Sequence, residues 1–397
     1  MEGKLDVEHH GSNRWQTASV PDKAYFKMAH DILAPQQPTT SIKEPTLRSA
    51  GREAEFNVAA HGLRGLASLM VLGAHILGGT ARHVYQANQS YVQAIEAPWF
   101  LGVFGVKLFF VISGYVIIPS ALRYSTTEFA TRRFLRIYPL FFVASVAFII
   151  LNFLTNEYPG LNNIKTIVSG LLFMNLFTGT EQLTPNAWSL TYEIIFYALT
   201  MWVVSSFIKR PSRVGAALAL SACAAFLLAF PISLFFVAGA LIRIYGSRLS
   251  IGTAILRIFE LFLFLGAAYL ASRALFNYSL SELVQPTALG ALICTACYFL
   301  LATDARSLTS LLFNNSFFSY IGAISYSLYL VHPYTYYLTR LLFIKTGLFT
   351  ENIFYSMLLF SIAVFISSVA CSHLAHILLE RLPYSWYFQQ RVYRRGK

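Results

Sequence analysis

From about residue 58 onward, the chain is a succession of apolar stretches long enough to cross a lipid bilayer. A transmembrane helix needs about 20 predominantly apolar residues. Only 12% of the 397 residues are charged, against roughly 25% in soluble globular proteins. So little charge over most of the length predicts an all-α polytopic membrane protein, because the hydrocarbon core tolerates only elements that pair their own backbone groups.

Ten stretches are predicted to be transmembrane helices. They cover residues 60–79, 99–119, 137–154, 187–208, 214–229, 230–245, 254–274, 284–302, 318–339 and 353–379. A further stretch, Ile164–Phe177, is short for a span at about 14 residues. We predict that it is re-entrant or interfacial, because a crossing there would put the Lys209–Arg213 cluster and the Arg132–Arg136 cluster on opposite sides.

The net charge of +12 does not indicate a nucleic-acid partner, because the basic residues sit in short clusters between the apolar runs. Such clusters are typical of cytoplasmic loops. They predict that both termini are cytoplasmic. The clusters are Arg132, Arg133 and Arg136; Lys209, Arg210 and Arg213; Arg243 and Arg248; and Arg391, Arg394, Arg395 and Lys397.

The chain divides into three predicted parts. Residues 1–58 are polar, contain proline and lack a signal-peptide core, which predicts a flexible cytoplasmic extension. Residues 59–383 form the transmembrane domain, and residues 384–397 a basic cytoplasmic tail. The four cysteines lie in apolar runs and predict neither a disulfide framework nor a metal site.

Inside the first apolar run, Arg64 and His75 are eleven residues apart. In an α-helix this spacing puts both side chains on one face, about 16 Å apart along the axis. Ionisable groups within a membrane are costly and by default functional. A cationic Arg64 and an imidazole deeper in the membrane form a line that suits a long donor with an anionic head, such as acyl-coenzyme A. His75 could take a proton from an attacking hydroxyl. The alternative is a snorkelling arginine and a histidine that only packs.

The fourth predicted span carries Glu193, with Ser189 four residues earlier on the same helix face. This carboxylate could orient or charge-balance His75, or hold a sugar hydroxyl. It could also be a structural partner for an intramembrane arginine. A charged group in such a run needs some partner.

Three further features have both a structural and a functional interpretation. Ser113 precedes Gly114, a pair that permits close helix contact. Arg133 and Arg136 could set the topology or clamp phosphates. His332 stands before a proline and could serve an acceptor or cap a broken hydrogen-bond ladder. Lys107 lies in the second run and receives no role.

Together these segments resemble the membrane acyltransferase 3 family, over roughly residues 58–383. Five elements occur in the family's order: Arg64-Gly-Leu-Ala with His75; Leu108-Phe-Phe-Val-Ile-Ser-Gly-Tyr115; Arg133-Phe-Leu-Arg136-Ile-Tyr-Pro139; Trp188-Ser-Leu-Thr-Tyr-Glu193-Ile-Ile-Phe-Tyr197; and Ile324-Ser-Tyr-Ser-Leu-Tyr-Leu-Val-His332-Pro333.

The resemblance implies an O-acyltransferase of a bacterial cytoplasmic membrane, with ten helices. Its donor would be acyl-coenzyme A, chiefly acetyl-coenzyme A, used as a substrate and not as a bound cofactor. The acceptor would be a hydroxyl of a lipid-linked sugar, a polysaccharide, peptidoglycan or a small molecule, and we expect a carbohydrate. It would be reached directly or through a separate extracytoplasmic partner. His75 and Glu193 are then the catalytic candidates, and Arg64, Arg133 and Arg136 bind the donor. Candidate acceptor or pocket residues are Ser113, Trp188, Ser189, Tyr326 and His332.

Two other functions compete with acyl transfer. A transporter or flippase of lipid-linked sugars would also need several helices and buried charges. It fits the clustered cytoplasmic arginines and the lack of internal repeats less well. A catalytically silent subunit of a glycan-assembly complex would require His75 and Glu193 to be dispensable.

Overall fold

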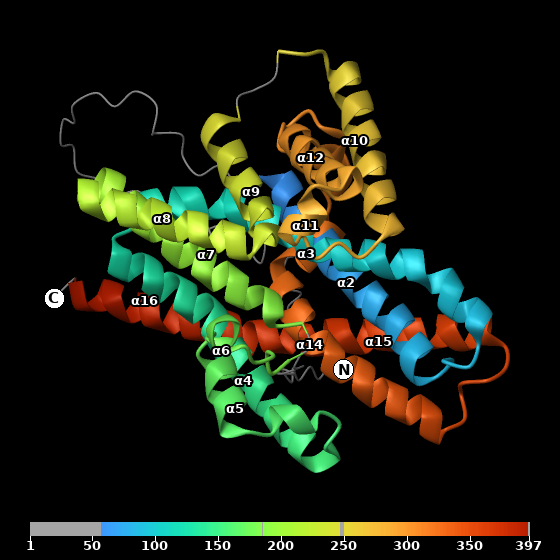
Figure 1. Cartoon of the computed structure of the whole chain (residues 1–397). Coiled ribbons are helices and arrows are strands. Elements are labelled where there is room, and N and C mark those ends of the chain that lie inside the picture. Colours follow the sequence, from blue (N-terminus) through green and yellow to red (C-terminus); the bar gives the residue numbers. More distant parts are fainter. Residues whose placement is uncertain (1–56, 185, 247–249, 396–397) are drawn as a thin grey trace, which may run out of the picture. The chain divides into compact units, whose positions relative to one another are not determined.

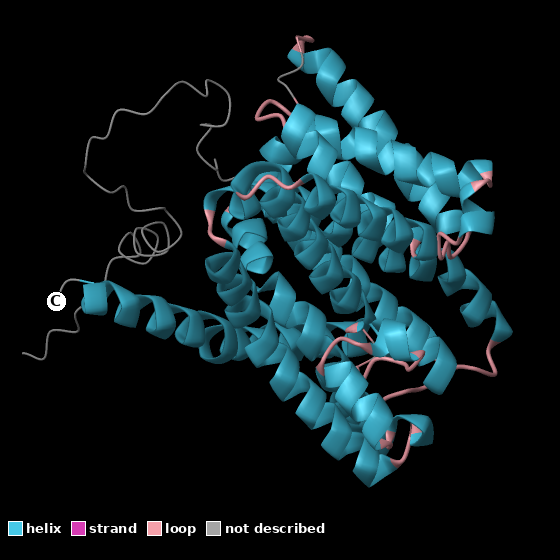
Figure 2. Ribbon diagram, turned by 60° about the vertical axis from the view of Figure 1, so that its left-hand side comes forward, coloured by secondary structure: helices cyan, strands magenta, loops and turns pink. Residues whose placement is uncertain are grey.

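The computed structural model describes residues 57–184, 186–246 and 250–395, and every element in these ranges is helical (Figures 1 and 2). The predicted extension therefore lies outside the described residues, apart from its last two positions, as does Arg248. The longer helices are α2 (Val58–His83), α3 (Gln89–Arg123), α4 (Thr126–Thr155), α7 (Trp188–Val204), α8 (Arg213–Ala229), α9 (Leu234–Tyr245), α10 (Thr253–Arg273), α12 (Pro286–Ala302), α14 (Ser316–Lys345), α15 (Ile353–Ala375) and α16 (Leu382–Arg395).

Short helices connect these elements: η1 (Pro159–Leu161), α5 (Ile164–Leu171), α6 (Asn175–Thr178), η2 (Ser205–Lys209), η3 (Pro231–Ser233), α11 (Leu280–Leu283), α13 (Leu308–Phe313) and η4 (His376–Arg381). Of these, η2 and η4 are π-helical. The segment predicted to be re-entrant contains α5, with eight residues, and α6, with four. At about 1.5 Å per residue neither can cross about 30 Å of hydrocarbon.

Each of the ten predicted spans coincides with a helix, but length and composition alone do not confirm ten crossings. Among the described residues, six helices are long and apolar enough to cross a bilayer, in the ranges Val58–His83, Gln89–Arg123, Thr126–Thr155, Trp188–Lys209, Thr253–Arg273 and Ile353–Gln389. Helices α8 and α9 meet at a 115° bend and add a seventh span if they are counted as one. Helix α12 has only 17 residues.

Helix α14 has 30 residues, yet it is not among the six apolar spans. Its buried residues include many polar ones: Ser325, Tyr326, Ser327, Tyr329, His332, Thr335, Tyr336 and Arg340. The helix also continues for twelve residues past Pro333 to Lys345. A membrane helix that buries polar groups against its neighbours is expected to serve a site rather than only to anchor.

The site rests on α2, which packs extensively against both α3 and α14. Small residues allow the helices to approach closely. A Cβ atom added at Gly105 of α3 would meet the backbone oxygen of Ala67 in α2 at 2.7 Å. Farther along α3, Gly114 faces the backbone of Phe236 in α9, and Gly239 of α9 faces the backbone of Val111. The Ser113-Gly114 pair thus has the close helix contact that the sequence indicates.

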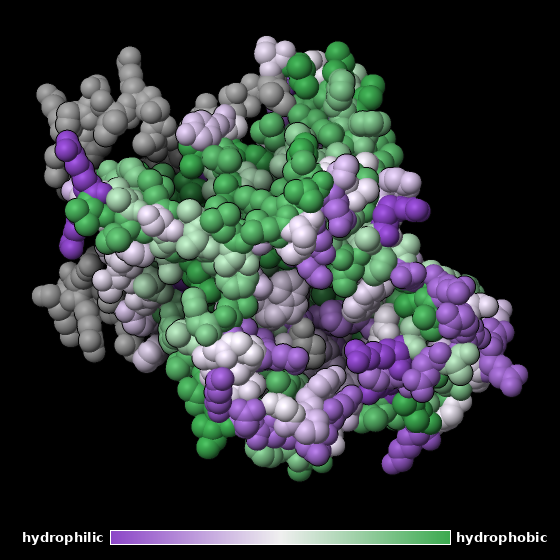
Figure 3. Space-filling model, in the orientation of Figure 1, coloured by the Kyte–Doolittle hydropathy of each residue, from purple (hydrophilic) through white to green (hydrophobic). Residues whose placement is uncertain are grey.

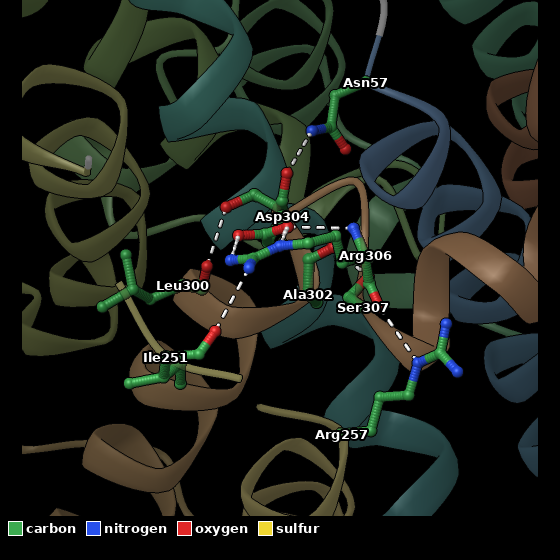
Figure 4. Close-up of polar contacts among 9 residues, drawn as sticks. Asn57, Ile251, Arg257, Leu300, Ala302, Asp304, Arg306 and Ser307 are labelled. Atoms are coloured by element: carbon green, nitrogen blue, oxygen red, sulfur yellow. Dashed lines mark hydrogen bonds and ion pairs between the residues drawn. The ribbon is translucent and has the colours of Figure 1, made fainter. Parts of the chain in front are cut away.

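One end of the helices is tied together by polar contacts between connecting segments (Figure 4). Asn57 caps α2 by accepting from the Ala60 N–H at 2.8 Å, and its amide donates to the Thr303 carbonyl at 2.9 Å. Arg306 pairs with Asp304 at 2.8 Å and donates to the Ile251 carbonyl at 3.1 Å. Arg257 donates to the carbonyl of Arg306, and Ser307 to that of Ala302. The start of α2 is therefore joined to the segments that precede α10 and α13.

The same end holds two further contacts, since α3 runs antiparallel to α2 and ends beside its start. Lys209 donates to the Tyr124 carbonyl, and Arg132 donates to the Tyr384 hydroxyl at 2.7 Å. We call this rim, formed by Asn57, Tyr124, Lys209, Ile251, Thr303 and Tyr384, the arginine end. At the opposite rim, the cavity end, the Tyr85 hydroxyl donates to the Thr350 carbonyl at 3.1 Å.

The surface of the molecule has an apolar part and a hydrophilic part. Figure 3 shows apolar surface over the helices α8 to α12, whereas hydrophilic atoms gather in the lower and right-hand part of this face. That is where Figure 1 places the connections that follow α2, α4 and α14. An apolar belt next to a hydrophilic rim is the surface expected of a protein that sits in a bilayer.

Candidate functional site

A cluster of charged side chains lies near the arginine end. Glu193 of α7 accepts a hydrogen bond from the Ser113 hydroxyl at 2.6 Å and another from the Tyr197 hydroxyl. Arg64 of α2 interacts electrostatically with Glu193 and with Arg136 of α4. The cluster therefore joins three helices through one carboxylate.

Arg133 completes this cluster. Its guanidinium donates to the Ser120 hydroxyl at 2.8 Å and lies 5.4 Å from the centre of the Tyr197 ring. Its buried Nε atom has no hydrogen-bond partner in the described part of the chain. Arg136, one turn along α4, is exposed. The structure thus brings together all three arginines predicted to bind the donor, with Glu193 and Ser113.

Sequence reasoning missed a second carboxylate of this cluster, Glu380, which also interacts electrostatically with Arg64. Glu380 is buried in the π-helix η4, accepts from the Ser327 hydroxyl and lies 3.4 Å from the His376 ring nitrogen Nδ1. π-Helical turns occur frequently at functional sites. A glutamate within the apolar sequence Ile-Leu-Leu-Glu380 was the available signal. Three arginines against two carboxylates leave the cluster with an excess of positive charge.

His75 lies farther along α2, in contact with His332 of α14. Their ring centres are 4.8 Å apart and the planes are inclined by 64°. The Nδ1 atom of His75 lies 2.9 Å from the Val71 carbonyl. A carbonyl oxygen can only accept, so Nδ1 carries the proton and the Nε2 atom of the neutral ring has the free lone pair.

His332 has the same arrangement but different surroundings. Its Nδ1 atom donates to the Leu328 carbonyl at 2.8 Å, its side chain is fully buried, and its Nε2 atom has no partner in the described residues.

Trp99 of α3 contacts His75 edge-on at 5.8 Å. Gly78 makes room for it, because a Cβ there would collide with the indole ring. Neither Trp99 nor Gly78 stood out in the sequence as a site residue.

A cavity of about 900 Å³ extends from His75 to the cavity end. The ends of α2, α4 and α14 and the start of α3 line it. Its walls are aromatic and polar, and include Trp99, Tyr158, Tyr334, Tyr336, Tyr337, Gln89, Gln93, Arg82, Glu96, Glu157 and Arg340. Partial burial, with the neighbouring Glu157 carboxylate, raises the pKa of the Tyr158 hydroxyl, which therefore stays protonated and can donate.

One more predicted residue, Ser189, belongs to a hydrogen-bond network near His332. The Ser189 hydroxyl is 2.8 Å from the Tyr329 hydroxyl, and Tyr329 donates to the Asn186 carbonyl. The Asn186 amide in turn donates to the Tyr329 carbonyl. This fully buried network joins the start of α7 to α14 within one turn of His332. Asn186 and Tyr329 were not predicted as site residues.

The remaining predicted residues do not line the cavity. Trp188 packs edge-on against Phe110 and Tyr192. The Tyr326 hydroxyl donates to the Ile137 carbonyl of α4 at 2.7 Å and so joins α14 to α4.

The predicted partnership of Glu193 with His75 has no contact in the structure. The hydrogen bonds of Glu193 go to Ser113 and Tyr197, whereas the ring neighbours of His75 are His332 and Trp99. Along α2, Arg64 and His75 are about 16 Å apart. The site therefore has two centres that α2 connects: a cationic cluster around Arg64, and His75 at the base of a cavity with His332 packed behind it.

In the described ranges, no group of three or more His, Cys, Asp or Glu side chains could hold a metal ion. All four cysteines are unbridged.

Comparison with known proteins gives one match. A family model described as an acyltransferase domain matches residues 57–376, which include both histidines and all of the cationic cluster except Glu380. No curated protein and no solved structure matches the chain. The match covers most of the chain and lends the transporter alternative no support. This chain therefore belongs to the acyltransferase 3 family and is an acyltransferase.

Proposed function

We propose that this acyltransferase moves an acyl group, acetyl by preference, from acyl-coenzyme A to a hydroxyl of a carbohydrate. It acts in the bacterial cytoplasmic membrane with the arginine end toward the cytoplasm. The carbohydrate belongs to an exopolysaccharide, a lipopolysaccharide or a lipid-linked sugar.

The cationic cluster supports a coenzyme A donor. Guanidinium groups pair bidentately with phosphates, and Arg64, Arg133 and Arg136 are held close together by their helices. Glu193 and Glu380 offset part of the charge, which lowers the cost of holding three cations without a ligand. A donor whose phosphates lie at this cluster directs its thioester along α2 toward His75.

The observation that carries the proposal is the state of the His75 ring. Because its Nδ1–H is committed to the Val71 carbonyl, Nε2 can accept a proton at the base of the cavity. The acceptor hydroxyl gives its proton to Nε2 as its oxygen bonds to the thioester carbon. The carbon–sulfur bond then breaks, and the coenzyme A sulfur leaves with the proton that His75 returns.

The cavity supports a carbohydrate acceptor that enters from the opposite side. Its tyrosines and Trp99 offer apolar faces for sugar rings, and its glutamines and charged groups can hydrogen-bond hydroxyls. An acceptor that reaches this cavity directly needs no separate extracytoplasmic partner. His332, packed on His75 and fully buried, positions the catalytic ring.

The rim contacts support the proposed topology of ten crossings with cytoplasmic termini. The segments that meet at the arginine end are the start of α2 and the segments around residues 124, 209, 251, 303 and 384. Ten crossings put all of these on the cytoplasmic side. The segments around residues 85 and 350, which meet at the cavity end, fall on the other side.

The test is acyl transfer from labelled acetyl-coenzyme A by purified full-length protein, with surface-glycan extracts as acceptors. His75→Gln keeps hydrogen bonding but cannot act as the base, so the rate should fall about 10²–10⁴-fold. His373→Gln is the matched control, because His373 is exposed and no residue of α15 lines the cavity. Normal turnover by well-folded His75→Gln would refute the mechanism. Mass spectrometry of surface glycans with and without the protein identifies the acceptor.

A further inference from the structure

Two polar side chains in the wall of the cavity take no part in the proton transfer described above. Arg340 and Tyr336 lie one turn apart on α14, and both line the cavity. Arg340 is 7% exposed and Tyr336 is 8% exposed. The Nε atom of Arg340 is buried and has no hydrogen-bond partner within the described chain. The buried Tyr336 hydroxyl interacts with the Arg340 side chain itself.

No carboxylate of the described residues forms an ion pair with Arg340. The acidic residues that line the cavity are Glu96 and Glu157, and both are exposed. The ion pairs of the described residues lie elsewhere, at Arg132, Arg306 and His376. A buried guanidinium without a counter-ion is costly. It is therefore expected to have an anionic partner that is not part of the chain.

The surroundings of Arg340 hold it in position without neutralising it. Its guanidinium carbon lies 5.6 Å from the centre of the Tyr336 ring and 5.4 Å from that of Tyr337. Such contacts offset part of the desolvation cost and restrict the planar group. A Cβ at Gly79 of α2 would collide with the Tyr336 hydroxyl, so glycine lets this hydroxyl lie against the helix.

We infer that Arg340 and Tyr336 form an anion subsite that binds a carboxylate or phosphate of the acceptor. This inference rests on the proposed function and names the acceptor's class: a carbohydrate with an anionic group beside the hydroxyl that is acylated. Arg340 is eight residues, or about 12 Å, beyond His332 along α14. Tyr326, on the other side of His332, interacts electrostatically with Glu193 and Arg136 of the cationic cluster. The anion at Arg340 is thus separate from the phosphates of the donor.

The test compares three probes by isothermal titration calorimetry on the purified full-length protein. Cellobiose is neutral, cellobiouronic acid carries a carboxylate, and glucose 1-phosphate carries a phosphate. At least one anionic probe should bind roughly tenfold or more tightly than cellobiose, as expected for hydrogen bonds to a charged group. Arg340→Gln should remove this preference, and Tyr336→Phe, which keeps the ring, should reduce it. Arg273→Gln is the matched control, because Arg273 is an exposed arginine outside the cavity.

An equal affinity for all three probes overturns the inference, as does a preference that survives Arg340→Gln. Nanodiscs distinguish a lipid headgroup from an acceptor. If phosphatidylglycerol, but not phosphatidylcholine, abolishes binding of the anionic probe, the subsite belongs to lipid and the acceptor assignment fails. Acetyl-coenzyme A turnover is measured on the same wild-type preparation. If turnover depends on His75 while the anion preference is missing, only the subsite is wrong and the proposed function stands.

Discussion

At the scale of single residues, the Nε2 atoms of His75 and His332 differ in their access to the cavity. Both rings commit Nδ1 to a carbonyl four residues earlier on their own helix. Only His75 lines the cavity, whereas His332 is fully buried behind it. A substrate hydroxyl can therefore reach the Nε2 atom of His75 but not that of His332. In the proposed mechanism, this difference favours His75 for proton transfer and His332 for positioning.

Arg64 and Arg133 should act on donor binding. Arg64→Ala and Arg133→Ala each remove a guanidinium from the cationic cluster, so the KM for acetyl-coenzyme A should rise roughly tenfold or more. Lysine should restore activity only in part, because it cannot pair bidentately with phosphate. Arg213, an exposed arginine at the start of α8, provides the control substitution. A KM that stays at the wild-type value in both variants would leave these arginines with topological or packing roles.

Glu193→Gln should impair transfer less than His75→Gln does. Glutamine can still accept hydrogen bonds from the hydroxyls of Ser113 and Tyr197, but it no longer offsets the positive charge of Arg64. Because Glu193 contacts the cationic cluster and not His75, we expect a changed KM for the donor with a smaller change in kcat. Steady-state kinetics over a range of acetyl-coenzyme A concentrations measure both. A loss confined to kcat, as large as that of His75→Gln, would instead make Glu193 part of the proton transfer.

At the scale of elements, close backbone approach fixes how α3 and α9 cross. Gly114→Ala would place a methyl group against the Phe236 carbonyl, where only a backbone shift can make room. Overpacking of this kind costs about 1–3 kcal/mol. Thermal unfolding in detergent should show a lowered midpoint. Gly73→Ala in α2 is the control, since no atom lies within 4 Å of the added carbon, and alanine favours a helix. Equal midpoints for both variants would contradict the packing argument.

The helices themselves were predictable because lipid leaves few alternatives, but their ends were not. α3 begins at Gln89, ten residues before the apolar run, and α4 begins at Thr126, eleven residues before its run. Asn88 and Ser125 cap these helices by accepting from backbone N–H groups. Hydropathy finds the stretch that lipid requires, whereas capping sets where the helix starts. The 115° bend between α8 and α9 likewise depends on local geometry at η3.

The site was predictable where a charge interrupts an apolar run, as at Arg64, His75 and Glu193. It was not predictable at Trp99, Tyr336 and Arg340, because aromatic and basic residues are common at the ends of spans. Only the structure shows that these three face a cavity and not the lipid headgroups. The partners of Glu193 could not be read from the sequence either, since they come from another helix, α3, as well as from its own.

At the scale of the whole molecule, the two centres of the site lie toward opposite ends of α2. The cationic cluster lies with the segments tied together at the arginine end, and the cavity reaches the other rim. The proposed function then depends on which rim faces the cytoplasm, because the proposed donor, acyl-coenzyme A, is made there. Sidedness is therefore the property on which donor and acceptor assignments jointly rest.

Single cysteines report sidedness in the full-length chain. The four native cysteines are unbridged and can be replaced. Glu181, Arg210, Asn314 and Glu351 are exposed residues of the connecting segments or next to them, and none lines the cavity. An impermeant maleimide applied to intact cells should label Glu181→Cys and Glu351→Cys. It should label Arg210→Cys and Asn314→Cys only after the membrane is permeabilised.

The labelling of these cysteines also tests two alternative topologies. If the segment that contains α5 and α6 crossed the membrane, the next helix would start inside, so Glu181→Cys would be protected and Arg210→Cys labelled. If α8 and α9 were one broken span, every later segment would change sides, so Asn314→Cys would be labelled and Glu351→Cys protected. A re-entrant α8–α9 pair and two full crossings give the same labelling, because both return the chain to the side it left. The cavity would then open outward in either case, which is the arrangement that transfer from a cytoplasmic donor to an outer carbohydrate requires.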